Sequence, residues 1–198
     1  MDELAYIRPP SALARILKKT AELKFDLASE TRTGALLRTL AASKPGGRFL
    51  ELGTGTGVAT AWIQEGMDNE SRLISVDVDN RLQDVAREAL GSDTRLTLTL
   101  EDALAFLRSQ PDESFDFVFA DALAGKYDGL EQALRVVKRG GFYIIDDMLP
   151  QPAWPEGHAE KVTPLLGAMA AHQEFEITPV AWASGLLIAV RKRAGIES

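Results

Sequence analysis

The stretch FLELGTGTGVATAWI, residues 49–63, decides the fold. Residues 48–52 form a short, largely apolar run that is followed at once by Gly53, which is typical of a buried parallel strand. Residues 58–67 have the pattern of a helix. Glycines at alternate positions between these two segments would leave backbone N–H groups uncovered by side chains, beside the positive N-terminal end of that helix. We therefore expect this turn to hold the polar groups of a small ligand; the alternative is that the glycines serve only a tight loop.

Length and composition indicate the class of protein. The chain has 198 residues, 45% of them hydrophobic, which is enough for one well-buried domain and short for two. We expect a single domain over 1–198, with a helical cover at 1–45 and a sheet core at 46–198. The net charge of −7 disfavours nucleic acid or an anionic membrane as partner. The lack of cysteine, of a secretory signal and of a long apolar run predicts a cytoplasmic protein that binds no membrane.

Strand and helix patterns alternate along the chain, which predicts an α/β fold. The expected order implies a doubly wound, Rossmann-like and mostly parallel seven-stranded sheet with helices on both faces and a C-terminal antiparallel hairpin. Expected strands are 48–52, 72–77, 95–100, 115–120, 141–145, 175–182 and 186–190, and expected helices are 11–22, 30–42, 58–67, 81–90, 103–108 and 127–138.

Acidic residues follow the second and third predicted strands. Asp77 comes about 20 residues after the glycines, where an acid holds ribose hydroxyls in doubly wound nucleotide folds. Asp102 has two interpretations: its carboxylate accepts a hydrogen bond from an adenine amino group, or it caps the following helix. A nucleotide at the carboxyl edge of the sheet is therefore expected.

The glycine turn departs from the dinucleotide pattern, because Val58 stands where that pattern has its last glycine. At this point the sequence resembles the class I S-adenosylmethionine-dependent methyltransferases, whose first motif is an acid two residues before GxGxG, here Glu51 before Gly53. The resemblance implies S-adenosylmethionine as cofactor. The cofactor-binding residues that it implies are Glu51, Gly53, Thr54, Gly55, Gly57, Asp77, Val78, Asp102, Ala103 and Asp121.

Within that class, the segments TRTGALLRTLAASKPGGRFLELGTGTG, FDFVFADALAGKY and GGFYIIDDML are similar to the catechol and caffeoyl-CoA type of small-molecule O-methyltransferase. The resemblance implies a divalent cation, most simply Mg²⁺, held by Asp121, Asp146 and Asp147. On physical grounds, three carboxylates that converge on one crevice repel each other unless they are protonated, partnered by cations or bound to a metal, and oxygen ligands suit a hard ion. The alternative is that Asp121 and Asp146 cap strand ends while Asp147 faces water.

The general base is left open by the sequence. Ala124 stands where the subgroup has a lysine, and Lys126 follows two positions later. Lys126 could replace that base, form a surface salt bridge, or indicate a substrate other than a catechol; a solvated lysine is the simplest interpretation. His158, in the segment 149–162 that we expect to cross the cofactor mouth, could act as base or be an ordinary histidine near a helix start. With Asp121, these are the candidate catalytic residues.

The expected function is transfer of a methyl group from S-adenosylmethionine to a hydroxyl of a small, phenolic or catechol-like acceptor, with help from the cation. Alternatives are an aminopropyltransferase-like enzyme, an N-methyltransferase acting on an amine, and a non-catalytic cofactor-binding protein. The N-terminal segment 4–27, with apolar residues such as Leu13 and Ile16, is expected to cover the substrate side or to form a homodimer contact.

Overall fold

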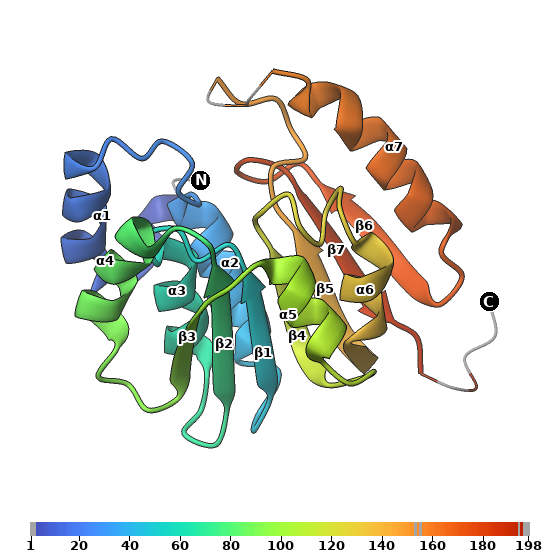
Figure 1. Cartoon of the computed structure of the whole chain (residues 1–198), viewed down its shortest axis with the longest axis horizontal. Coiled ribbons are helices and arrows are strands. Elements are labelled where there is room, and N and C mark those ends of the chain that lie inside the picture. The colour runs from blue at the N-terminus through green and yellow to red at the C-terminus, as the bar shows by residue number, and fades with distance from the viewer. Residues whose placement is uncertain (1–2, 153, 155, 194, 196–198) are drawn as a thin grey trace.

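A computed structural model gives the fold of the chain and describes residues 3–152, 154, 156–193 and 195. Seven strands form one sheet, in the order β3-β2-β1-β4-β5-β7-β6 (Figure 1). The strands are β1 (Arg48–Leu52), β2 (Arg72–Asp77), β3 (Leu96–Leu100), β4 (Phe115–Ala120), β5 (Val137–Ile145), β6 (Phe175–Val180) and β7 (Leu186–Arg191). The helices are η1 (Glu3–Tyr6), α1 (Leu13–Glu22), α2 (Thr31–Ala41), α3 (Val58–Gly66), α4 (Asn80–Leu90), α5 (Ala103–Ser109), α6 (Leu130–Arg135) and α7 (His158–Ala171).

The sheet is parallel from β3 to β5, and β7 then pairs antiparallel with both β5 and β6. Strand order reverses between β1 and β4, which lie side by side with Leu50 opposite Val118. At such a switch point the connections leave in opposite directions and open a crevice at the carboxyl ends of the strands. The predicted doubly wound sheet and its terminal hairpin are confirmed.

Helices cover both faces of the sheet (Figure 1). α1 to α4 lie on one face, where Trp62 of α3 is fully buried among residues of α1, α2 and α4. α5 to α7 lie on the other face and pack with β4, β5 and β7 around Tyr143 and Phe115. The inner strands are apolar toward both layers because both of their faces are covered. The packing of helices on both faces fixes the positions of the strand ends.

Three segments differ most from the sequence-based expectation. The helix predicted at 127–138 is only α6, because Val137 is taken into β5 opposite Phe115, and a register shift follows in β4. The strand predicted at 175–182 ends at Val180. The extent of α7 was not predicted, although a helix start near His158 was considered, and Pro164 within its sequence is typical of a helix break. Tertiary packing decides each of these three segments.

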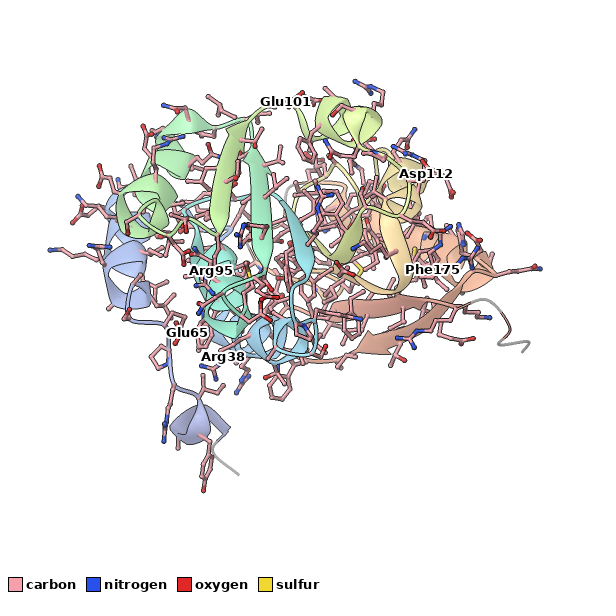
Figure 2. The ribbon with its side chains drawn as sticks, turned by 90° about the horizontal axis from the view of Figure 1, so that it is seen from below. Arg38, Glu65, Arg95, Glu101, Asp112 and Phe175 are labelled. Atoms are coloured by element: carbon pink, nitrogen blue, oxygen red, sulfur yellow. The ribbon has the colours of Figure 1, made fainter. Side chains whose placement is uncertain are left out.

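The two ends of β3 are marked by residues labelled in Figure 2. Arg95 precedes the strand and Glu101 follows it, so Glu101 lies at the carboxyl edge of the sheet. Across the part of the chain that the structure describes, none of the helices is long and apolar enough to span a bilayer.

Candidate active site

A cavity of about 480 Å³ lies at the carboxyl ends of β1, β2, β3 and β4. It is called here the first cavity. Its wall includes the glycine turn after β1, the ends of β2 and β3, and the linker between α1 and α2. Of the residues that the resemblance implies, Gly53, Thr54, Gly55, Asp77, Val78, Asp102, Ala103 and Asp121 line it. Volume and lining are those of a site for one nucleotide-sized ligand.

The glycine turn is shaped by close approach of backbone to backbone. Gly53 has φ of +101°, and a Cβ there would lie 2.8 Å from the backbone oxygen of Asp121. A side chain at position 53 would therefore separate β1 from β4. Gly57 serves a different purpose, because it contacts Ala86 of α4 and does not line the cavity. Only part of the motif faces the ligand space.

Asp77 joins the turn to the end of β2. Its Oδ2 accepts a hydrogen bond from Gly55 N at 2.7 Å, and its Oδ1 accepts one from Asp79 N at 2.9 Å. Asp102 caps α5 by accepting from Ala105 N at 2.8 Å, so the capping interpretation is correct, and the residue also lines the cavity. Both carboxylates are thus held in fixed positions at the cavity wall.

Glu51 lies behind the turn and not in the cavity. It is fully buried, and its Oε2 accepts hydrogen bonds from Ser75 Oγ and Thr60 Oγ1, whereas Oε1 has no partner among the described residues. Burial raises the pKa of Glu51 to about 7. The acid of the first motif therefore supports the turn from inside, without lining the ligand space.

A second cavity, of about 290 Å³, adjoins the first. Its wall carries the side chains of Asp146 and Asp147 after β5 and of Trp154 in the segment before α7. Asp121, at the end of β4, lines both cavities. Asp121 thus lies between the two cavities.

Two carboxylates of the second cavity are hydrogen-bonded, that of Asp146, which is buried, and that of Asp121, which is 10% exposed. Asp121 Oδ2 accepts from Ser29 Oγ at 2.7 Å, and Asp146 Oδ1 accepts from Ser184 Oγ and from Asp147 N at 2.8 Å. Burial, followed by the charge of Asp146, raises the pKa of Asp121 well above its usual range. Burial and the charge of Asp147 raise the pKa of Asp146 to about 6. These carboxylates hold protons more readily than surface acids do.

Lys126 is buried, with 3% of its side chain exposed, so its interpretation as a solvated lysine is wrong. Its Nζ lies 3.3 Å from Asp147 Oδ2 and 3.7 Å from Asp121 Oδ1. The side chain does not line either cavity. Lys126 therefore reaches the carboxylates from the protein side, opposite the ligand space.

His158 begins α7, as the second interpretation of this residue expects, and it is buried. Its Nε2 lies 3.0 Å from the hydroxyl of Tyr127, and its ring stacks on Trp154 at 4.3 Å between centroids. Burial lowers the pKa of His158. The residue does not line either cavity, so its contacts fix Trp154 in the wall of the second one.

The predicted metal ligands do not form a metal-holding group. Across the described ranges, no three Asp, Glu, His or Cys side chains come together in an arrangement that could hold a metal ion. Ser29 and Ser184 occupy one oxygen each of Asp121 and Asp146, and the Lys126 ammonium faces the remaining oxygen of Asp121. The donor set as it stands does not fit a divalent cation, which needs several free oxygens at once.

The linker between α1 and α2 was missed as a binding segment. Leu27, Ala28 and Ser29 line both cavities, and Phe25 lines the first. Phe25 and Leu27 belong to the N-terminal segment 4–27, and Ala28 and Ser29 directly follow it. No local pattern marks these residues, because they reach the site only through the packing of α1 and α2 on α3.

Comparison with known proteins agrees with this geometry. The methyltransferase domain family matches residues 50–148. A catechol O-methyltransferase of Mycobacterium tuberculosis is 28% identical over 145 residues, which is 71% of this chain and 66% of that enzyme. The chain spans 62%, 56% and 52% of three further mycobacterial relatives.

Solved structures share the fold. The O-methyltransferase of Bacillus cereus in complex with SAH has a TM-score of 0.79 at 22% identity, with 94% of this chain and 93% of that one covered. The O-methyltransferase TomG of Streptomyces achromogenes, in complex with SAM, has a TM-score of 0.80 at 20% identity, with 94% and 92% covered. With its strand order, glycine turn and family match, the chain belongs to the methyltransferase domain family and is a methyltransferase of the S-adenosylmethionine-dependent class.

Proposed function

We propose that this enzyme transfers the methyl group of S-adenosylmethionine to a hydroxyl of a small, phenolic or catechol-like molecule. The observation that carries the proposal is that Asp121 lines both cavities, so a carboxylate lies where cofactor and acceptor would meet. The similarity to the M. tuberculosis catechol O-methyltransferase supports oxygen as the receiving atom.

S-adenosylmethionine would fill the first cavity. Its polar end would lie against the backbone of the glycine turn, its ribose on Asp77, and its adenine between Leu82 and Leu104 near Asp102, all of which line that cavity. Apolar walls bind the base while a few fixed polar groups orient the ligand. The sulfonium methyl would then face Asp121 and the second cavity.

The transfer needs orientation and removal of one proton. With the acceptor in the second cavity, its oxygen attacks the sulfonium methyl in line, the O–C bond forms, the C–S bond breaks, and S-adenosylhomocysteine leaves. We propose that the Asp121 carboxylate takes the hydroxyl proton, and that Ser29 Oγ holds that carboxylate in position. Trp154, in the wall of the second cavity, offers an aromatic surface to a phenolic ring.

The Asp77→Ala variant is expected to bind S-adenosylmethionine about tenfold or more weakly than the wild type. The substitution removes a charge-assisted hydrogen bond to ribose worth about 1.5 to 3 kcal/mol, and it also releases Gly55 N. Isothermal titration calorimetry gives both dissociation constants. Undiminished affinity in the variant would remove Asp77 from the cofactor site.

An amine acceptor is the second candidate, because carboxylates dominate the wall of the second cavity. Asp26, Glu30, Asp121, Asp146 and Asp147 all line it, and such a wall favours a cationic group. Methyl transfer to nitrogen and an aminopropyl transfer both remain compatible with this charge.

A labelled-methyl screen tests the proposal. Purified protein is incubated with S-adenosylmethionine labelled in the methyl group and with matched phenols, catechols and amines, and label in each product is counted. We expect label in phenols or catechols. Label only in amines would favour the second candidate. Bound cofactor with no label in any acceptor would favour a non-catalytic binding protein.

Self-association through the N-terminal segment is a further proposal. Tyr6 and Leu17 are exposed on this segment, at 79% and 42%, and a homodimer would bury them. Sedimentation equilibrium should give twice the chain mass, and the double variant Tyr6→Ser, Leu17→Ser should sediment closer to one chain mass. A wild type that is monomeric at high concentration would reject the dimer.

A further inference from the structure

The loop after β4 fixes Lys126 in place. Tyr127 N and Asp128 N both donate to the backbone oxygen of Leu123, and Gly125 N donates to Asp128 O at 2.7 Å. Gly125 has φ of +86°, and a Cβ there would lie 2.6 Å from Leu52 Cδ1. The tight loop therefore depends on glycine at position 125 and turns the next side chain, that of Lys126, into the protein.

The Lys126 ammonium is the positive partner of the carboxylates at the strand ends. It lies within salt-bridge distance of Asp147 Oδ2 and Asp121 Oδ1, at 3.3 and 3.7 Å. Burial of an ammonium costs several kcal/mol unless opposite charges lie close, and two carboxylates near each other need a cation for the same reason. The carboxylates thus offset the cost of burying the ammonium, and the ammonium offsets the repulsion between the carboxylates.

We propose that Lys126 takes the place of the divalent cation at this site: its ammonium holds Asp121 and Asp147 in position, and methyl transfer proceeds without a metal ion. A divalent cation among these carboxylates would lie within a few ångströms of the ammonium, which repels it. The three carboxylates also do not form a metal-holding group as they stand.

The role of Lys126 is that of a positioning residue. Its side chain does not line either cavity, so it acts on the reaction through Asp121 and Asp147. That methyl transfer proceeds without a metal ion rests on the proposed function, whereas the absence of divalent-cation binding at Lys126 does not. A metal titration therefore tests the inference even if the acceptor is of another class.

The experiment compares the wild type with Lys126→Met, which keeps the length of the side chain and removes its charge. Lys18→Met, on the exposed surface of α1, is the control. Mn²⁺ is titrated into each protein and followed by calorimetry, after near-ultraviolet circular dichroism has shown that each is folded. We expect no binding at millimolar Mn²⁺ in the wild type or in Lys18→Met, and one bound ion per chain in Lys126→Met.

Turnover is then measured on the acceptor found in the screen, with and without excess chelator. We expect wild-type turnover to be unchanged by chelator, and Lys126→Met to lose about tenfold or more in kcat with cofactor affinity preserved. One Mn²⁺ bound per wild-type chain, or wild-type turnover lost in chelator and restored by Mg²⁺, would overturn the inference. If Lys126→Met does not fold, the wild-type titration still decides it.

Discussion

The Asp121→Asn variant is expected to transfer methyl groups about 100-fold or more slowly than the wild type, since it cannot take the proton of the acceptor hydroxyl. Asparagine has nearly the same shape as aspartate, and its carbonyl oxygen can still accept from Ser29 Oγ. Cofactor affinity should therefore change by no more than about threefold, and the loss should appear in kcat. Single-turnover kinetics with saturating cofactor measures it.

Asp112→Asn is the matched control for that measurement. Asp112, labelled in Figure 2, has 73% of its side chain exposed, forms an ion pair with Arg135 and lines neither cavity. The control should keep the wild-type kcat. An equal kcat in Asp121→Asn and in the control would show that another group takes the proton.

The second large effect is on stability and involves Glu51. Its pKa in the folded protein is about 7, against an ordinary value of 4.5, so between these values the folded state binds more protons than the unfolded state. Unfolding free energy therefore falls as pH rises from 4.5 to 7, by about 3 kcal/mol for this one group. Urea unfolding of the wild type and of Glu51→Gln, across this range, should show a smaller pH-dependent loss of stability in the variant.

Other buried acids, such as Asp146, also titrate between pH 4.5 and 7. The quantity to compare is therefore the difference in unfolding free energy between the wild type and Glu51→Gln at each pH. Glu65→Gln, at an exposed position near the end of α3 (Figure 2), should follow the wild-type profile. Identical profiles for Glu51→Gln and the wild type would show that folding does not raise the pKa of Glu51.

The fold was predictable because its signals are local. Short apolar strands, each followed by a glycine turn or an acid, specify β1, β2, β4 and the core of β5, and their alternation with helices specifies a parallel sheet. α7 was not predictable in this way, since Pro164 disrupts the local pattern and contacts with the sheet override it. The order of the strands within the sheet was not predicted, because it depends on contacts between segments that lie far apart in the chain.

The site was predictable only where its residues end strands. Asp77 and Asp121 are at the cavity wall as expected. The contact of Ser29 with Asp121 joins segments that are 92 residues apart in the chain. The burial of Lys126 depends on the path of one loop. No sequence pattern encodes either feature. Glu51, the acid of the first motif, is the opposite case, because the motif was recognised in the sequence but the side chain is buried in the interior and does not reach the cavity.

The atom that receives the methyl group is the most direct test of whether this enzyme methylates oxygen. The enzyme is incubated with S-adenosylmethionine carrying ¹³C in its methyl group and with the best acceptor from the screen, and the product is examined by ¹³C nuclear magnetic resonance. We expect the wild-type product to show a methyl signal correlated through the ether oxygen to an aromatic carbon, and this product to be nearly absent with Asp121→Asn. A methyl bonded to nitrogen, or a product formed equally well by both proteins, would contradict this expectation.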